Sequence, residues 1–252
     1  MDEQRAWWEE LFQIHEFATY PELAASLTER EADFLEQAVP LQPDMTILDL
    51  ACGGGRHLLA LAERGYRVEG VELAAPVVRH LTDTIAQRKL NSRVLERDMR
   101  DLDGLGPYDV ALIMNSSFGF FSDSEHIALL QSVADVLAPQ GKLLLQCINP
   151  YQISRYMQDY RRGWHAVGPG YVLRESQFVP QTGTIETQYR YVEPEGGSIA
   201  HPGERIRLYT YPELLTMLRI AGLTPVAAFG DAALPVVPFG EESLWQIIVA
   251  RK

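Results

Sequence analysis

Three consecutive glycines follow an apolar segment in the stretch TILDLACGGGRHL, which spans residues 46–58. Asp49 stands near the end of that segment, and small residues follow it at every second position: Ala51, Gly53 and Gly55. Glycine loses more conformational freedom on ordering than any other residue, so its use here needs a reason. Glycines let the backbone pass close to a ligand and turn into a helix whose first amide groups face it. The stretch therefore predicts a nucleotide-type pocket at the carboxyl end of a strand.

Strand and helix patterns alternate from residue 45 to residue 148, and the strands are continuous apolar runs. This alternation predicts a parallel sheet with helices on both faces. Residues 150–208 instead alternate apolar and polar residues between Gly and Pro turns, which predicts antiparallel strands with one wet face. A helix over residues 211–223 and two strands over residues 224–231 and 244–252 are expected to follow.

The glycine spacing distinguishes two kinds of cofactor site. Gly53 and Gly55 match the first two glycines of the dinucleotide fingerprint G-x-G-x-x-G, but the third position holds Leu58. A bulky residue there spoils the close packing of helix on strand, which argues against an NAD(P)-dependent oxidoreductase. Counted from Asp49, the pattern Asp-x-Ala-x-Gly-x-Gly resembles the first motif of the class I S-adenosylmethionine-dependent methyltransferases.

The resemblance extends over residues 45–148 and 229–252 and implies roles for residues at the strand ends. Glu72 ends the second predicted strand, where the family carries an acid, more often Asp, for the ribose hydroxyl groups. Asp98 and Met99 resemble the pair that binds the adenine, with the carboxylate accepting from its exocyclic amine. The cofactor-binding residues implied in this way are Asp49, Ala51, Cys52, Gly53, Gly55, Glu72, Leu73, Asp98, Met99, Asn115 and Tyr20.

Asn115 is the candidate for a catalytic role, because it ends the fourth predicted strand beside the expected position of the methyl group. Its side-chain carbonyl could orient an amine or hydroxyl nucleophile, or it could cap the strand or its loop. The residues after it lack the prolines of the related motif in DNA and protein-amide N-methylases, so that chemistry is not carried over. His165 and His201 are candidate bases or plain surface residues. Candidates for the acceptor wall are Phe118, Phe120 and Phe121, although a run of aromatic residues is more often part of the core.

Together these patterns predict an α/β fold, a Rossmann-like doubly wound methyltransferase sheet of seven strands with the last strand antiparallel. Residues 1–44 are expected to form an N-terminal helical cap. Residues 45–149 and 209–252 would form the S-adenosylmethionine-binding core. Residues 150–208 would form a small antiparallel β insert, and the cap and the insert would cover the substrate side of the core.

The N-terminal cap is expected to contain two amphipathic helices with a break near Tyr20. The second helix should start near Thr28, because Glu31 stands three residues later and completes the spacing of a capping box. Tyr20, Trp7 and Trp8 could close over the cofactor, although packing between helices is the simpler role for the tryptophans.

The chain has 252 residues with a net charge of −12, 46% hydrophobic residues and two cysteines. The charge argues against nucleic acid as the main partner, since phosphate contacts need a basic surface. The cysteines give neither a disulfide framework nor metal-ligand spacing, so no metal is expected. The chain shows no membrane-span pattern and an acidic N-terminus without signal-peptide layout, which favours a cytoplasmic protein. Oligomeric state is not predicted.

The resemblance implies methyl transfer from S-adenosylmethionine to an N or O nucleophile of a small molecule. An RNA or protein methyltransferase would use the same chemistry and would need a basic, aromatic-lined groove. An NAD(P)-dependent oxidoreductase and a non-catalytic S-adenosylmethionine-binding protein are the alternatives from other classes.

Overall fold

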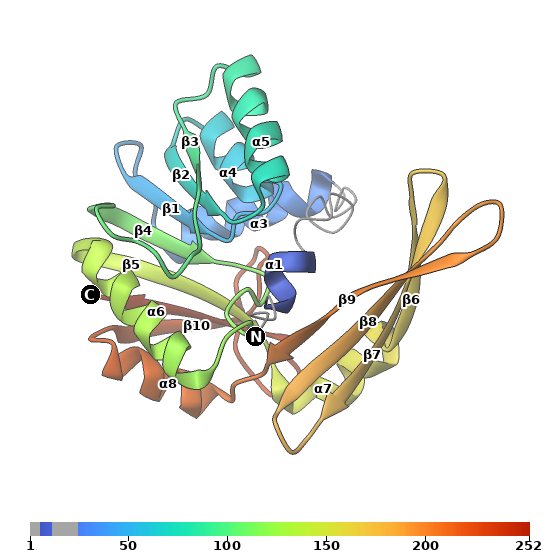
Figure 1. Cartoon of the computed structure of the whole chain (residues 1–252). Helices are drawn as coiled ribbons and strands as arrows, with labels where there is room; N and C mark the ends of the chain where they lie inside the picture. The colour runs from blue at the N-terminus through green and yellow to red at the C-terminus, as the bar shows by residue number, and fades with distance from the viewer. Residues whose placement is uncertain (1–5, 12–24) are drawn as a thin grey trace, which may run out of the picture.

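The described residues form two separate sheets, and the larger one has helices on both faces (Figure 1). The computed structural model describes residues 6–11 and 25–252. The larger sheet has the order β11-β10-β12-β5-β4-β1-β2-β3. Its strands are β1 Thr46–Leu50, β2 Arg67–Glu72, β3 Arg93–Glu96, β4 Tyr108–Ile113, β5 Leu137–Ile148, β10 Thr224–Asp231, β11 Val237–Pro238 and β12 Trp245–Arg251.

The five neighbouring strands β3, β2, β1, β4 and β5 run parallel to one another. Strand β12 is antiparallel to both β5 and β10. This confirms the predicted doubly wound sheet with an antiparallel last strand. The two-residue strand β11 adds an eighth strand, at the edge, to the seven that were expected. Because the chain runs from β1 outward to β2 on one side and β4 on the other, its order reverses at β1, which is where such sheets bind ligands.

Apolar side chains fill both faces of the larger sheet. One face is covered by α6 (Asp123–Val136) and α8 (Tyr211–Ile220). The other is covered by α3 (Ala25–Ala38), α4 (Arg56–Glu63) and α5 (Ala75–Gln87). The strands are buried from both sides, which explains why their sequences are continuous apolar runs.

The insert forms a four-stranded antiparallel sheet that stands away from the core (Figure 1). It follows a 3-10 turn, η1 (Pro150–Gln152), and α7 (Ile153–Tyr160). Strands expected over residues 170–179 and 183–193 match β7 and β8, the strand expected over residues 204–211 overlaps only the end of β9, and β6 was not predicted. The strands are β6 Arg162–Val167, β7 Gly170–Val179, β8 Thr184–Val192 and β9 Ser198–Arg207.

The loop after β4 is joined to the insert. The main-chain N–H of Arg207, at the end of β9, donates to the carbonyl oxygen of Gly119 at 2.8 Å. A Cβ atom at Gly119 would lie 2.7 Å from Ile206 Cγ2 and 3.0 Å from the carbonyl oxygen of Arg207, so only glycine fits at this contact. The insert and the loop after β4 are thus held as neighbours.

The start of the second N-terminal helix differs from expectation, and the break expected near Tyr20 lies outside the described residues. α3 begins at Ala25, three residues before Thr28, so Thr28 lies inside the helix and does not cap it. Glu31 therefore has no capping role and instead contacts α4. The first helix, α1 (Trp7–Leu11), lies between the core and the four-stranded sheet, where Leu11 is buried against Val172 and Tyr189 (Figure 1).

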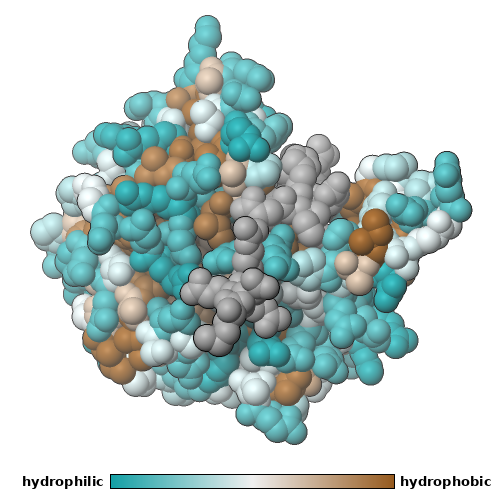
Figure 2. Space-filling view, in the orientation of Figure 1, coloured by the Kyte–Doolittle hydropathy of each residue, from teal (hydrophilic) through white to brown (hydrophobic). Residues whose placement is uncertain are grey.

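The surface in Figure 2 is mostly hydrophilic, with hydrophobic patches that include one over the four-stranded sheet. On that sheet Trp164 and Tyr171 are exposed, and their rings meet edge to face with centroids 5.4 Å apart. In the part of the chain that the structure describes, no helix is long and apolar enough to cross a membrane.

Candidate active site

Asp49 is a buried carboxylate near the carboxyl end of β1, with 2% of its surface exposed. Its Oδ2 atom is buried and has no hydrogen-bond partner among the described residues. Burial raises the pKa of Asp49 to about 6, although the neighbouring His57 and the positive charge of Arg56 oppose the rise. A buried oxygen without a hydrogen bond lowers the stability of the fold unless a ligand supplies the missing partner. Asp49 therefore indicates a binding site at this edge of the sheet.

The loop after Asp49 is left-handed at every second residue. Ala51 has φ 53°, Gly53 has φ 53° and Gly55 has φ 76°. A Cβ atom at Gly55 would lie 2.5 Å from Leu81 Cδ1 on α5, so this position needs glycine for space as well as for conformation. The spacing of small residues seen in the sequence is therefore the spacing of the left-handed positions.

Leu58 packs closely on the sheet despite its size. A Cβ atom at Gly70 on β2 would lie 2.7 Å from Leu58 Cδ1 and 2.8 Å from Cys52 Sγ. The small residue at the helix–strand contact is thus on the strand, whereas the dinucleotide fingerprint places it on the helix. This is how the fold tolerates a leucine at the third fingerprint position.

Glu72 fixes the glycine-rich loop. Its Oε2 accepts from the main-chain N–H of Gly53 at 2.9 Å, and its Oε1 accepts from that of Ala74 at 2.8 Å. Burial raises the pKa of Glu72, opposed by these hydrogen bonds. Leu73, the next residue, is half-buried. The structure therefore brings the ends of β1 and β2 together around one carboxylate.

Asp98 and Met99 lie just beyond β3, where Met99 is buried and Asp98 is half-buried. Both oxygens of Asp98 accept hydrogen bonds from Arg100: Oδ1 from the main-chain N–H at 2.8 Å and Oδ2 from Nη2 at 2.7 Å. Burial would raise the pKa of Asp98, but the hydrogen bonds from Arg100 outweigh it and hold the pKa below its usual value. The carboxylate is thus kept ionised and fixed in orientation.

Asn115 follows β4 in a strained turn. Asn115 has φ 52° and Ser116 has φ 61°, and neither is glycine. The turn is tied to β5, because the Asn115 N–H donates to Gln146 Oε1 at 3.1 Å and Ser116 Oγ accepts from the N–H of Ile148 at 2.9 Å. The Asn115 side chain is exposed. Left-handed non-glycine residues cluster at functional sites, where the surrounding structure holds them.

Aromatic side chains connect α1 to the loop after β4. The Trp7 and Phe120 ring centroids are 5.2 Å apart, and those of Trp8 and Phe121 are 5.0 Å apart, both edge to face. Phe118 is fully buried in the core. The tryptophans therefore pack on the predicted acceptor wall. Tyr20, the remaining candidate from this segment, lies outside the described residues.

Comparison with known proteins identifies the family. A profile of the methyltransferase domain family matches residues 47–141. The CcbJ methyltransferase from Streptomyces caelestis has the same fold, with a TM-score of 0.78 over 98% of this chain and 97% of that one at 21% identity. Cypemycin N-terminal methyltransferase from Streptomyces sp is 30% identical over 191 residues, 75% of this chain and 76% of that protein. The chain is a class I S-adenosylmethionine-dependent methyltransferase.

The methyltransferase fold confirms the expected cofactor, S-adenosylmethionine, and sets aside the NAD(P)-dependent alternative. The described residues fit a cationic adenosyl ligand. Asp49 offers an unpaired buried oxygen, and Glu72 adds a second buried carboxylate. Between them the backbone of Gly53 is bare of side chain, which permits the close approach that an extended ligand needs.

Two groups near the site were not predicted. Glu31 on α3 contacts the start of α4: its Oε2 lies 2.7 Å from His57 Nε2 and pairs with the Arg56 guanidinium. Burial would raise the pKa of Glu31, but the hydrogen bond with His57 and the charge of Arg56 lower it. The contact joins residues 26 positions apart, so no local pattern reveals it.

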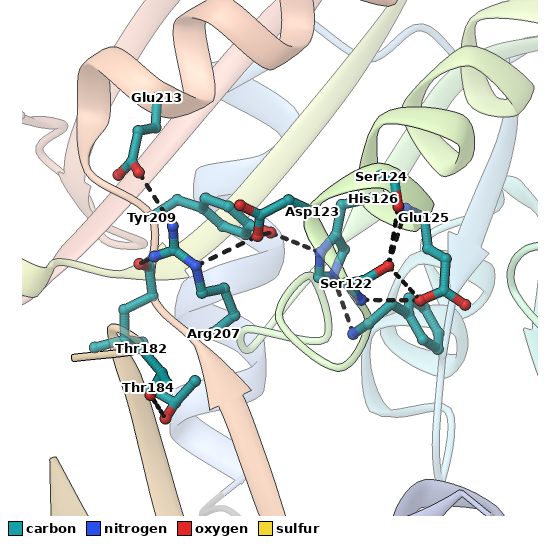
Figure 3. Close-up of polar contacts among 12 residues, drawn as sticks. Ser122, Asp123, Ser124, Glu125, His126, Thr182, Thr184, Arg207, Tyr209 and Glu213 are labelled. Carbon is teal, nitrogen blue, oxygen red and sulfur yellow. Dashed lines mark hydrogen bonds and ion pairs between the residues drawn. The ribbon is translucent and has the colours of Figure 1, made fainter. Parts of the chain in front are cut away.

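The second unpredicted group contacts the loop after β4, which carries Phe120 and Phe121 and is called the aromatic loop (Figure 3). His126, fully buried on α6, accepts a hydrogen bond at Nε2 from the main-chain N–H of Phe121 at 3.3 Å. Tyr209 and Asp123 complete the group on the other side of the imidazole. In contrast, the insert residues His165 and His201 are not part of this cluster. The described part of the chain contains no group of His, Cys, Asp or Glu side chains placed to hold a metal ion.

Proposed function

We propose that this methyltransferase transfers the methyl group of S-adenosylmethionine to the nitrogen of an aliphatic amine in a small molecule. The names of three relatives support this choice. One acts on dTDP-3-amino-3,6-dideoxy-alpha-D-glucopyranose, at 28% identity over 71% of this chain. Another is glycine/sarcosine N-methyltransferase, at 27% identity over 58% of this chain. The acceptors in these two names are amines. The third relative, cypemycin N-terminal methyltransferase, is named for methylation at an N-terminus.

We place the cofactor across the carboxyl ends of β1, β2 and β3. Asp49 and the loop at Gly53 would face its amino acid and sulfonium part, Glu72 its ribose, and Asp98 with Met99 its adenine. The cofactor supplies an electrophilic methyl group on a positively charged sulfur. Acidic surroundings suit that charge, and the unpaired Oδ2 of Asp49 is the observation that carries the placement.

The acceptor would enter over the loop after β4. Asn115 is the candidate for orienting the amine, because its side chain is exposed at the end of the strand next to β1. Phe120 and α1 would form the wall of the acceptor site. Residues 1–44 and the insert of residues 150–208 would cap the core on this side. The amine must be neutral to use its lone pair, and its proton would leave to solvent once the new bond has formed.

RNA is the runner-up acceptor, since a 23S rRNA (uracil(1939)-C(5))-methyltransferase from Chromobacterium violaceum is also similar. That match covers 26% of the relative's length, so most of that protein lies outside the comparison. The arginines that could form a basic groove are largely paired with acids: Arg155 with Glu242, Arg162 with Glu175, and Arg205 with Glu186. A small-molecule acceptor agrees better with a net charge of −12.

The test is a matched acceptor panel with the purified chain. Glycine, an amino sugar and a short peptide with a free N-terminus are each paired with the N-acetylated form, and a ribosomal RNA fragment is added. Formation of S-adenosylhomocysteine and the mass of the product are measured. We expect methylation of free amines and none of the acetylated partners. Methylation of a hydroxyl group or of the RNA, or no turnover of any amine, would overturn the proposal.

A further inference from the structure

Arg100 contacts the predicted adenine-binding carboxylate and the aromatic loop at the same time. Its main-chain N–H, Nε and Nη2 donate to Asp98, and its Nη1 donates to Glu125 Oε1 at 2.7 Å. The face of the same guanidinium lies over two rings, 4.4 Å from the centroid of Phe121 and 5.6 Å from that of Trp8. One side chain therefore joins the end of β3, the start of α6, the loop after β4 and α1.

The contact with Asp98 has the forked geometry that only arginine provides. Nε lies 3.0 Å from Oδ1 and Nη2 lies 2.7 Å from Oδ2, so two parallel hydrogen bonds hold the carboxylate in the plane of the guanidinium. Oδ1 already accepts from both the main-chain N–H and Nε, whereas Oδ2 accepts chiefly from Nη2 and has a lone pair left for one more hydrogen bond. Asp98 is thus ionised, fixed and still able to accept from an exocyclic amine.

The contact with Glu125 is anchored on its other side. Glu125 Oε2 accepts from Ser122 Oγ at 2.6 Å and from the Ser122 N–H at 3.0 Å, which forms the capping box of α6. Since the capping box fixes Glu125, the guanidinium has one rigid partner on each side. Because both ends of the guanidinium are held, placing its face over the rings of Phe121 and Trp8 costs little further side-chain entropy.

Trp8 completes the arrangement. Its ring meets Phe121 edge to face with centroids 5.0 Å apart, and its Nε1–H is buried with no hydrogen-bond partner among the described residues. Arginine over a tryptophan or phenylalanine face is attractive, and more so where water is excluded. Arg100 therefore contacts Asp98 on one side and the Trp8 ring of α1 on the other.

We propose that Arg100 is a positioning residue that couples adenine recognition at Asp98 to the seating of Trp8 and α1 against the loop after β4. The proposal rests on the cofactor placement given under the proposed function. The fork from Arg100 holds Asp98 ionised and in plane before the cofactor binds, so the carboxylate is ready to accept from an adenine amine. In the same orientation Arg100 presents its face to Phe121 and Trp8. The cofactor base and the wall of the acceptor site are then set by the same guanidinium.

The test compares Arg100→Gln and Arg100→Lys with a matched control, Arg97→Gln. Arg97 is exposed to a similar degree, 34% against 32%, and pairs with Asp101 in the same loop without touching the rings. Calorimetry measures the Kd of S-adenosylhomocysteine and of S-inosylhomocysteine, which lacks the exocyclic amine. Tryptophan fluorescence is followed in the same titrations, with Trp8→Phe to assign the signal, and circular dichroism confirms the fold.

We expect Arg100→Gln to weaken S-adenosylhomocysteine binding by about tenfold or more and to change the Kd of the inosyl analogue by less than about threefold. The fluorescence response that Trp8→Phe removes should also be lost in Arg100→Gln. Arg100→Lys keeps the charge without the fork and should fall between wild type and Arg100→Gln. Arg97→Gln should match wild type in every readout.

Equal weakening for both ligands in Arg100→Gln would show a general structural role and overturn the proposal, as would unchanged affinity with an unchanged fluorescence response. These readouts need no methyl acceptor. A failed amine panel therefore leaves them intact, whereas wild-type protein that binds neither ligand would overturn the cofactor placement itself.

Discussion

His126 hydrogen-bonds the hydroxyl group of Tyr209 in the interior of the molecule, with 2.8 Å between Nδ1 and Oη (Figure 3). The partners determine where the protons lie. Because the N–H of Phe121 can only donate, Nε2 of His126 accepts, and the ring proton is on Nδ1. Tyr209 then accepts from the imidazole and donates to Asp123 Oδ1 at 2.7 Å. A neutral histidine is thus built into the support of the aromatic loop.

The first prediction concerns the pH dependence of folding. Burial lowers the pKa of His126 to about 4 from 6.5. Between these two pH values the imidazole is protonated in the unfolded state but not in the folded state. The free energy of unfolding therefore decreases as pH falls from about 6.5 toward 4. The loss amounts to at most about 3 kcal/mol.

Urea unfolding of wild type and of His126→Asn between pH 4.5 and 7.5 measures this loss as a difference between two curves. The difference should shrink as pH falls, because the variant lacks the titrating group. His80→Asn, an exposed position on α5, is the control and should run parallel to wild type. Parallel curves for His126→Asn would contradict the assignment; if that variant does not fold, an NMR titration of the imidazole in the wild-type protein tests the same lowered pKa.

The second prediction concerns Asp49, whose pKa is raised to about 6 by burial. Ionising a buried carboxylate is unfavourable, so the ligand-free protein should lose stability as pH rises from about 4 through 6. The affinity for S-adenosylmethionine should rise over the same interval, because the ionised carboxylate attracts the cationic ligand. The two readouts should therefore move in opposite directions.

Calorimetric titrations and urea unfolding at matched pH values test this pair of trends. Asp49→Asn should flatten both, bind the cofactor more weakly and be at least as stable as wild type above pH 6. Glu72→Gln is the companion variant and should keep the Asp49 trend while lowering affinity. An affinity in Asp49→Asn that still rises through pH 6 would assign the titration to another group.

The third prediction separates strain from space at two left-handed glycines. Gly65 has φ 95°, and a Cβ atom there would meet no other atom within 4 Å, whereas at Gly55 the same atom would lie 2.5 Å from Leu81. Gly65→Ala should cost about 1–2 kcal/mol for the backbone conformation alone. Gly55→Ala should cost a further 1–3 kcal/mol, roughly, for overpacking. Urea unfolding of both variants measures the difference, and equal costs would contradict the steric argument.

The fourth prediction concerns Glu31 and its partners at the start of α4. Glu31→Gln leaves the largely buried Arg56 without its counter-charge and should destabilise the fold by about 3 kcal/mol. Because α4 begins directly after the glycine-rich loop, cofactor affinity should fall too. Glu29→Gln is the control, since Glu29 is 59% exposed and its pair with Arg64 should contribute less than about 1 kcal/mol. Thermal unfolding that ranks the two variants equally would argue against the role of Glu31.

The glycine-rich loop shows how far local sequence can predict structure. The spacing of small residues singles out positions 51, 53 and 55, and all three are left-handed. The fold class followed from apolar runs of the right length, because burial of strands on both faces leaves a local signature. The assignment of these residues to parts of the cofactor stays a prediction.

The misses have a common physical cause. Thr28 and Glu31 fit a capping box by spacing, yet Glu31 is bound by His57, a partner that the local sequence does not reveal. The strand β6 was missed because its residues do not alternate between apolar and polar: it contains Gly163 and an exposed Trp164. Its partly buried positions are set by pairing with the neighbouring strand. His126 on α6 looks like an ordinary helix residue until the fold places Tyr209 beside it.

Gly119 has a consequence for the design of chimeras. Its carbonyl oxygen holds the end of β9, and its missing side chain admits Ile206. A chimera that exchanges the hairpins of residues 162–207 between related enzymes should therefore dock on the larger sheet only where the recipient keeps a glycine at this junction. A bulkier residue there would uncouple the transplanted segment from the catalytic half, whatever pocket it carried.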